Sequence, residues 1–347
     1  MRLSGENLRS GLAALGVLLL VAACGGDGDS GSATGQTEGI EKAQFKIALV
    51  TDVGQLNDRG FNQLAYEGLK RAEKELDVEI RVAQSRSAAD YIPNHTTLVR
   101  QGFDLVIGVG FAQGDAVDVA ASRLPDARYA IIDVDQQSLK HKPKNVVGIL
   151  FKEEQAGYLA GVLAGLAVKG ESAAPVVGSV GGYKEPPVDR FIAGYQAGAK
   201  WAVPQVKTLN GYSSDWDDAA KCKELALDQI ARGASVVFQV AGGCGLGALD
   251  AAKERDVWGI GVDADQSFLG DFVLTSAMKR VDEAVFRTIK SVIEGRWEGG
   301  KNLVFGLEED GVGLGKISPQ VPDEDRTVLE DVESKIRAGE VTIPRSL

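Results

Sequence analysis

Short apolar runs alternate with amphipathic segments from Phe45 to the end of the chain. Several of the runs, such as Ile47 to Val50, are apolar at every position, as strands covered on both faces require. Between them, apolar residues recur at i, i+3, i+4 and i+7, the spacing of an amphipathic helix. The pattern predicts strands at Lys46–Thr51, Glu79–Ala83, Leu105–Gly108, Tyr129–Asp133, Val146–Leu150, Val176–Val180, Val206–Asn210, Ser235–Gln239, Trp258–Val262 and Phe272–Ser276.

Strand–helix alternation predicts an α/β fold of parallel sheets joined by right-handed crossovers. The strands are too many for one comfortable sheet, so we expect two Rossmann-like lobes. The predicted helices are Asp58–Leu76, Glu153–Val168, Val188–Ala202, Asp217–Arg232, Leu246–Arg255 and Asp282–Glu294.

The chain is expected to cross between the lobes more than once. Residues 146–165 are predicted to form a strand that leads across into a long helix of small residues. The segment after Val262 is predicted to return to lobe 1, and the segment from Val304 is predicted to return to lobe 2. We therefore assign residues 45–149 and about 264–303 to lobe 1, and 150–263 and about 304–347 to lobe 2. Ligands of such sheets bind beyond the carboxyl ends of the strands, so a hinged clamp with a cleft between the lobes is expected.

The first residues form a targeting segment. Arg2 and Arg9 precede a charge-free apolar run, Gly11 to Ala23, which is shorter than the ~20 residues that span a bilayer. Small residues before Cys24 resemble a bacterial lipobox, although an ordinary signal peptide with a chance cysteine has the same outline. We expect residues 1–23 to be removed, Cys24 to be lipidated, and 24–44 to form a flexible tether rich in Gly and Ser.

Charge and composition exclude some partners. The formal net charge is −11, and no run of Lys or Arg occurs in the 347 residues. Nucleic acid is not expected as a partner, because binding phosphates requires clustered cations. No attraction to an anionic membrane surface is expected either.

Polar, glycine and aromatic residues follow the predicted strands. Carboxylates accept paired hydrogen bonds from vicinal hydroxyls, an amide can donate to and accept from a heterocycle edge, and aromatic planes stack on a flat base. These residue types suit a small uncharged ring compound that carries hydroxyl groups. The candidates are Asp52, Phe61, Asn62, Asp133 or Asp135, Trp216, Gly242, Asp263 or Asp265, and Lys279.

Structural roles are open for several of these residues. Asp52 could cap the helix that begins near Asp58 or close an Asx-turn. Phe61 fits the apolar stripe of its helix and could be a core residue. Trp216 lies in a polar loop, where a core role is less natural, and Lys279 could only balance nearby carboxylates.

Enzyme chemistry has little support in the sequence, and neither a cofactor nor a metal is expected. Neither histidine, His95 or His141, lies in a metal or nucleophile pattern, and both are predicted to be surface residues. HExxH, GxSxG, CxxC and the P-loop motif do not occur. The GGCGLG stretch follows a strand, but its glycine spacing differs from GxGxxG, so a tight turn is the better interpretation.

Cys222 and Cys244 remain in the mature chain. The start of a helix and the end of the following strand share one edge of a parallel sheet, so this pair could reach disulfide distance, and an extracytoplasmic compartment permits the bond. Two isolated small side chains are the equal alternative.

Four segments together resemble the basic membrane protein (BMP) lipoproteins, and within them the PnrA-like purine nucleoside receptors. They are KIALVTDVGQLNDRGFNQLAYEGL, GGCGLG, GVDADQ and LTSAMKRVD. The resemblance covers about Phe45 to Leu347. It implies the type I periplasmic-binding-protein fold and a role in delivering cargo, often nucleosides, to an ABC importer.

The resemblance also implies residue roles. Phe61 and Trp216 would stack on the base, Asn62 would read its edge beside Asp52, and Asp133 would be a second base-side carboxylate. Asp263 and Lys279 would bind the ribose hydroxyls, with backbone contact from Gly242.

We therefore expect a monomeric, lipid-anchored extracytoplasmic binding protein. Its partners would be an ABC permease and a purine nucleoside such as adenosine, guanosine or inosine. The alternatives are a binding protein for a sugar or a signalling furanose, a nucleoside hydrolase that uses the same carboxylates, and a surface adhesin or sensor.

Overall fold

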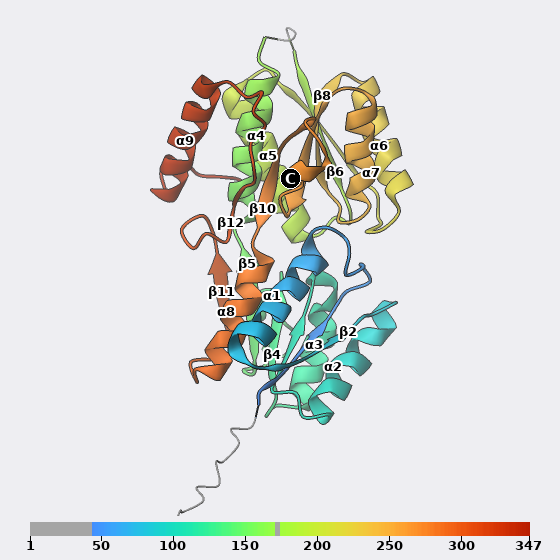
Figure 1. Ribbon diagram of the computed structural model, residues 1–347, viewed down its shortest axis with the longest axis vertical. Coiled ribbons are helices and arrows are strands. Elements are labelled where there is room, and N and C mark those ends of the chain that lie inside the picture. Colours follow the sequence, from blue (N-terminus) through green and yellow to red (C-terminus); the bar gives the residue numbers. More distant parts are fainter. Residues whose placement is uncertain (1–43, 171–173) are drawn as a thin grey trace, which may run out of the picture. The chain divides into compact units, whose positions relative to one another are not determined.

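Two parallel sheets form the cores of two α/β lobes (Figure 1), which confirms the predicted fold class. The computed structural model describes residues 44–170 and 174–347, so the predictions for residues 1–23, for Cys24 and for most of the tether lie outside the described residues. In lobe 1 the strand order is β11-β5-β4-β3-β1-β2, all parallel. These strands are β1 (Lys46–Val50), β2 (Glu79–Ala83), β3 (Leu105–Gly108), β4 (Arg128–Ile132), β5 (Val146–Phe151) and β11 (Lys301–Phe305).

The sheet of lobe 2 has the order β12-β10-β9-β8-β6-β7. Its strands are parallel except that β12 runs antiparallel to β10. They are β6 (Val176–Gly181), β7 (Lys207–Tyr212), β8 (Ala234–Val240), β9 (Trp258–Asp263), β10 (Val273–Lys279) and β12 (Val312–Leu314).

Helices cover both faces of each sheet, which explains the runs without alternation. In β1, Ile47 and Leu49 face the core that contains α1, whereas Ala48 and Val50 face the core that contains α2 and α3. The described helices are α1 (Phe61–Leu76), α2 (Tyr91–Arg100), α3 (Gly114–Arg123), α4 (Glu153–Ala167), α5 (Pro186–Ala202), α6 (Ala219–Ala231), α7 (Gly245–Glu254), α8 (Val281–Ile293) and α9 (Asp323–Arg337).

The chain passes between the lobes three times, between β5 and α4, between β10 and α8, and between β11 and β12. The predicted boundary near residue 264 is wrong for β10. This strand pairs with β9 and β12 in the second sheet, and the chain enters lobe 1 only at α8. The sequence resembles a return after Val262 because a turn and a 3₁₀ segment at Ser267–Leu269 interrupt the pattern there.

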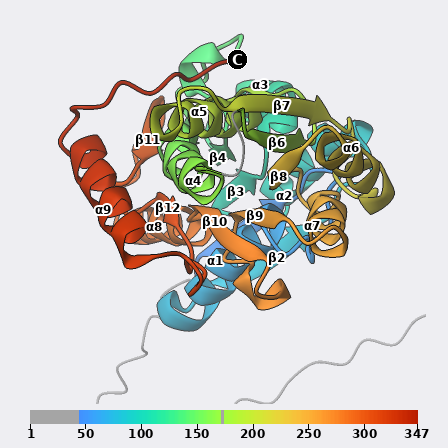
Figure 2. The ribbon, with the colours of Figure 1, turned by 90° about the horizontal axis from the view of Figure 1, so that it is seen from above.

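The small residues of α4 allow close packing against α5 (Figure 2). A Cβ at Gly157 would lie 2.2 Å from the Phe191 carbonyl oxygen, and one at Gly161 would lie 2.0 Å from the Tyr195 carbonyl oxygen. The two backbones therefore approach more closely than any larger side chain permits. The run of small residues that predicted a long helix in the sequence therefore also lets α4 pack closely on α5 beside the second sheet.

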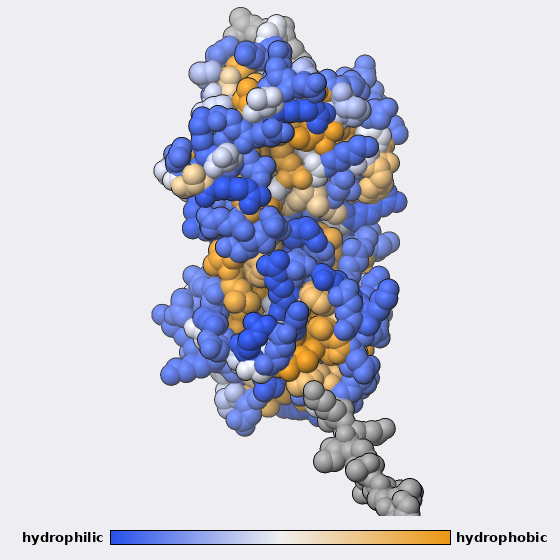
Figure 3. All heavy atoms as spheres, turned by 60° about the vertical axis from the view of Figure 1, so that its left-hand side comes forward, coloured by the Kyte–Doolittle hydropathy of each residue, from blue (hydrophilic) through white to orange (hydrophobic). Residues whose placement is uncertain are grey.

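One surface prediction is wrong. His95 is fully buried, and its Nε2 lies 2.9 Å from Gln113 Oε1. Burial lowers the pKa of His95 to about 4. His141 is half-exposed, with Nδ1 2.7 Å from Asp118 Oδ2. The surface in Figure 3 is mostly hydrophilic, with apolar areas on both lobes. Among the described helices, none is long and apolar enough to cross a bilayer.

Candidate ligand-binding cleft

A cavity of about 610 Å³, counted to its open mouth, lies at the carboxyl ends of both sheets. The eight residues predicted to bind ligand all line it. Asp52, Phe61, Asn62 and Asp133 come from lobe 1, and Trp216, Gly242, Asp263 and Lys279 come from lobe 2.

Asp52 and Asn62 form a hydrogen-bonded pair in the lobe 1 wall. Asn62 Nδ2 donates to Asp52 Oδ1 at 3.1 Å and to Asp58 Oδ2 at 3.2 Å, and the Gly54 amide also donates to Asp52 Oδ1, at 2.8 Å. Asn62 Oδ1 is buried and has no hydrogen-bond partner among the described residues. A buried acceptor without a partner is costly, so this oxygen is poised for a donor from a ligand.

Asp58, which the sequence analysis did not assign to the site, organises the start of α1. Its carboxylate accepts hydrogen bonds from the backbone amides of Gly60, Asn62 and Gln63 at 2.9, 2.8 and 3.2 Å. Helix N-termini leave such amides without partners, and an aspartate supplies the acceptors. The alternative that Asp52 caps this helix is therefore wrong. The alternative Asx-turn is present, because Asp52 Oδ1 accepts from the Gly54 amide, and Asp52 also lines the cavity.

Two half-buried aromatic side chains enter the cavity from different lobes. Phe61 begins α1, and the Lys279 ammonium lies 5.0 Å from the centroid of its ring. Trp216 lies in the turn before α6 and packs on Gly182, with its ring centroid 5.4 Å from that of Tyr183. Both aromatic side chains line the cavity as well as packing against the core.

Lys279 belongs to a buried ionic cluster at the end of β10. Its Nζ donates to Asp133 Oδ1 and Oδ2, both at 2.7 Å, and lies 3.1 Å from Glu153 Oε1. Glu153 also pairs with Arg190, at 2.9 Å. Lys279 thus has carboxylate partners other than Asp263. Its pKa is raised to about 12, because the surrounding carboxylates outweigh the opposing effect of burial.

The structure shows which aspartate faces the cavity at each of the two positions that the sequence left open, Asp133 or Asp135 and Asp263 or Asp265. Asp133 and Asp263 line the cavity. Asp135 instead accepts from Gln137 N and Asn302 Nδ2, at 2.8 and 2.7 Å, and Asp265 accepts from Ser267 N at 3.1 Å. Asp133 and Asp263 have φ angles of 71° and 63°. Left-handed backbone is costly for non-glycine residues and concentrates at functional sites.

Burial changes the protonation of the cavity carboxyls. It raises the pKa of Asp52 to about 6 and that of Asp263 to about 7. Burial raises the pKa of Asp133 to about 6, although the Lys279 charge opposes the shift. Glu185, which the sequence analysis missed, also lines the cavity, and burial followed by repulsion from Asp52 raises its pKa to about 7. Its position after β6, directly before Pro186, is the strand-end signal that could have identified it.

The cavity therefore offers many acceptors and little free positive charge. Five carboxyl side chains line it, and Lys279 is the one cationic side chain among its lining residues. Hydroxyl and amino groups of a neutral ligand can donate to these carboxyls, whereas a phosphate would face repulsion. Among residues 44–170 and 174–347, no group of three or more His, Cys, Asp or Glu side chains is placed to hold a metal ion.

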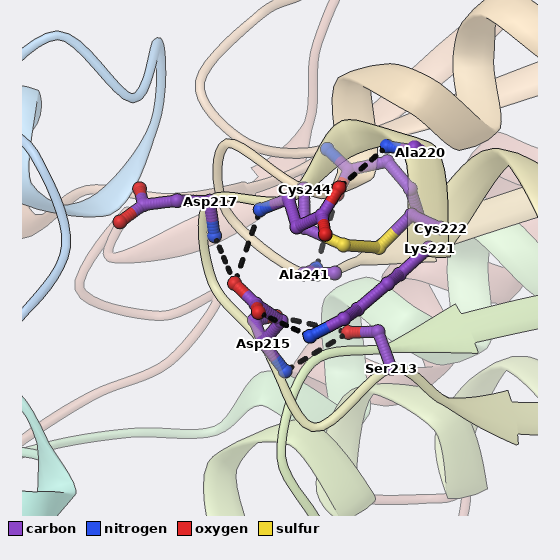
Figure 4. The surroundings of a disulfide bond; sticks show 10 residues. Ser213, Asp215, Asp217, Ala220, Lys221, Cys222, Ala241 and Cys244 are labelled. Carbon is purple, nitrogen blue, oxygen red and sulfur yellow. Dashed lines mark hydrogen bonds and ion pairs between the residues drawn. A yellow bond between two sulfur atoms is a disulfide. The ribbon is translucent and has the colours of Figure 1, made fainter.

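Cys222 and Cys244 form a disulfide next to the turn of residues 213–218, which carries Trp216 (Figure 4). Their Cα atoms are 5.6 Å apart. Both side chains are fully buried. Of the two alternatives left by the sequence, the structure has the bonded pair. Gly242 lies on the cavity side of Cys244 with φ +55°, which favours glycine.

Comparisons with known proteins agree with this architecture. The Bmp family model, described as ABC transporter substrate-binding protein PnrA-like, matches residues 45–346. A Lactococcus lactis protein named ABC transporter nucleoside-binding protein BmpA is 34% identical, covering 95% of this chain and 96% of its own. A Pyrococcus abyssi protein named an uncharacterized lipoprotein is 32% identical, over 97% and 92%. A solved ABC transporter solute-binding protein from Aeropyrum pernix has a TM-score of 0.78 at 27% identity, over 86% and 92%.

Proposed function

Since the chain belongs to the Bmp family of PnrA-like ABC transporter substrate-binding proteins, we propose that it binds a purine nucleoside in the interlobe cavity. The family consists of binding proteins that work with a permease, so the ligand is carried and not converted. The chemistry of the cavity supports a nucleoside over other small molecules.

The base would lie between Phe61 and Trp216. Aromatic side chains from both lobes line the same cavity as Asn62, whose Oδ1 has no hydrogen-bond partner in the described part of the chain, and this combination is the observation that carries the proposal. A flat heterocycle fits between aromatic rings, and such stacking contributes roughly 1–3 kcal/mol per base. An amino or ring N–H group of the base would donate to Asn62 Oδ1 or to the carboxylate of Asp52.

The ribose would lie against Asp263, Lys279 and the backbone of Gly242. Vicinal hydroxyls can donate together to one carboxylate, and the Lys279 ammonium can donate to a hydroxyl oxygen while it keeps Asp133 as a partner. The name of the Lactococcus lactis relative, a nucleoside-binding protein, agrees with this assignment.

Ligand release followed by mass spectrometry tests the proposal directly. Purified protein should release a purine nucleoside, and calorimetry should then show binding of adenosine, guanosine or inosine to the emptied protein. Phe61→Ala should weaken that binding by about 1–3 kcal/mol. Binding of ribose or another sugar without any nucleoside binding would refute the assignment, and release of free base during incubation with inosine would indicate hydrolysis.

We also propose that a lipid on Cys24 holds the protein on the outer side of the membrane. The support is the lipobox-like sequence, the Gly- and Ser-rich segment after it, and the name of the Pyrococcus abyssi relative as a lipoprotein. Expression in a bacterial host should place the wild-type protein in the membrane fraction. Cys24→Ala should lose lipid labelling, and labelling that persists in this variant would contradict the proposal.

A further inference from the structure

The turn that carries Trp216 has little support from its own sheet. Residues 213–218 connect β7 to α6, and β7 is an edge strand whose one neighbour among the described strands is β6. The side chains of this turn are exposed or half-buried. Such segments have few buried contacts and open easily, so the position of the Trp216 ring depends on what fastens the turn to the rest of the lobe.

Hydrogen bonds inside the turn centre on Asp215 (Figure 4). Its Oδ1 accepts from the amides of Asp217 and Asp218 at 2.9 and 3.0 Å, and its Oδ2 accepts from Lys221 Nζ at 2.7 Å. These bonds give the turn its shape. They do not fix where the turn lies relative to the cavity, because all the partners belong to the turn or to the first residues of α6.

Backbone hydrogen bonds attach the turn to the rest of lobe 2 on two sides. The amides of Ser213 and Ser214 donate to the carbonyl oxygens of Gly181 and Gly182, at 2.9 and 3.0 Å. On the other side, the Cys244 amide donates to the Trp216 carbonyl oxygen at 2.8 Å. Trp216 is therefore held from the side of Gly242 and Gly243 through the backbone of Cys244.

The disulfide reinforces this second attachment covalently. Cys222 lies in the first turns of α6, a few residues after Trp216, and Cys244 immediately precedes α7. The bond joins the start of α6 to the residue that precedes α7, next to the Trp216–Cys244 hydrogen bond. Small residues such as Ala226 and Ala248 belong to the same buried cluster. Without it, only noncovalent contacts would keep α6 and the Trp216 turn in register with the Gly242 turn.

We propose that the Cys222–Cys244 disulfide is a positioning element of the binding site, which holds Trp216 in its ligand-binding arrangement before the ligand arrives. The inference rests on the proposed function, because it assigns Trp216 to the base. A site that is ordered in advance loses less conformational entropy on binding, so its affinity is higher. The Asp217 carboxylate of the same turn lies near the Gln55 backbone of lobe 1.

The test is the double variant Cys222→Ala/Cys244→Ala, whose alanines suit the small-residue surroundings. We expect about tenfold weaker purine nucleoside binding by calorimetry, mainly through faster dissociation. Val237→Ala, in the same buried cluster, is the control, because it removes core packing and leaves the disulfide intact. It should lower the melting temperature with little change in affinity.

A mutant cycle shows whether the disulfide acts through Trp216. In a Trp216→Ala background, removal of the disulfide should cause less than about a twofold further loss of affinity. Tenfold loss in that background, or affinity within about twofold of wild type in the folded double variant, would overturn the inference. Two titratable thiols in the unreduced, denatured mature protein would overturn it as well.

Hydrogen exchange without ligand separates this inference from the proposed function. The amides of Asp217, Asp218 and Cys244 should exchange faster in the double variant than in Val237→Ala. Equal exchange would overturn the positioning role even if nucleosides bind. If the wild-type protein binds no nucleoside, the proposed function fails and the exchange experiment still decides whether the disulfide orders the turn.

Discussion

Gly182→Ala should expel the Trp216 ring from its place in the cavity wall without touching the ligand. Gly182 follows β6 and is not one of the lining residues. A Cβ at this position would lie 2.2 Å from Cζ3 and 2.5 Å from Cε3 of Trp216. Carbon atoms in contact are separated by roughly 3.5 Å, so the ring must move by about 1 Å or more. The backbone of Gly182 does not have a positive φ, so alanine adds no backbone strain there.

Loss of one stacking partner costs about 1–3 kcal/mol, which corresponds to roughly 5- to 150-fold in affinity. Calorimetry with the best-binding purine nucleoside measures this loss, and thermal unfolding should show that the variant is folded despite the overpacking. Trp216→Ala should show a similar loss, and adding Gly182→Ala to it should change the affinity little. Gly313→Ala is the matched control, because the nearest atom to its added Cβ lies 4.0 Å away.

Wild-type affinity in a folded Gly182→Ala protein would refute this reasoning. It would mean that the Trp216 ring either does not occupy the position that Gly182 leaves open for it, or does not contact the ligand there. An equal loss in Gly313→Ala would show that the effect does not come from the ring.

Asp263→Ala should weaken adenosine binding more than adenine binding, and equal losses by calorimetry would contradict its assignment to the ribose. Lys279→Met leaves Asp133 buried without its cation, so we expect a loss of about 3–5 kcal/mol in the free energy of unfolding; urea denaturation measures it, and a change below 1 kcal/mol would show that the pair is dispensable. Burial raises the pKa of Asp263 from 3.8 and that of Glu185 from 4.5, each to about 7. Between about pH 4 and 7 the folded protein therefore retains protons that the unfolded chain has released, so the contribution of these two groups to stability falls as pH rises through this interval. Replacing Asp263 by Asn should make the urea midpoint depend less on pH. If the midpoint of the variant varies between pH 5 and 8 as steeply as that of the wild-type protein, the role of burial is contradicted.

The sequence predicts most of the sheet framework and the cavity wall, because both depend on local patterns. Buried parallel strands are apolar runs, and the residue after such a strand lies at the carboxyl edge, so Asp52 and Asp263 could be found. The strands β11 and β12 and the helices α2, α3 and α9 were missed. Val312–Leu314 is only three residues long, and α2 contains Pro93 and two threonines.

Partners of the site residues could not be predicted in the same way. Lys279 pairs with Asp133, 146 positions away in the chain, and nothing in the local sequence distinguishes that carboxylate from Asp263 as its partner. Asn62 Oδ1 lacks a partner among residues 44–170 and 174–347 because of where the amide nitrogen of this side chain finds its acceptors. The left-handed backbone at Asp133 comes from tertiary packing, because aspartate alone does not require it.

The ionic cluster of Lys279, Asp133 and Glu153 lies where the chain passes between the lobes, since Lys279 ends β10 and Glu153 begins α4. Contacts close to these crossings would move little if the lobes rotated about them, so opening the lobes would change the distances within the cluster little. Their energy therefore contributes almost equally to open and closed forms and cannot drive closure. Closure of the lobes around a ligand would therefore depend on groups farther from these crossings, such as Trp216.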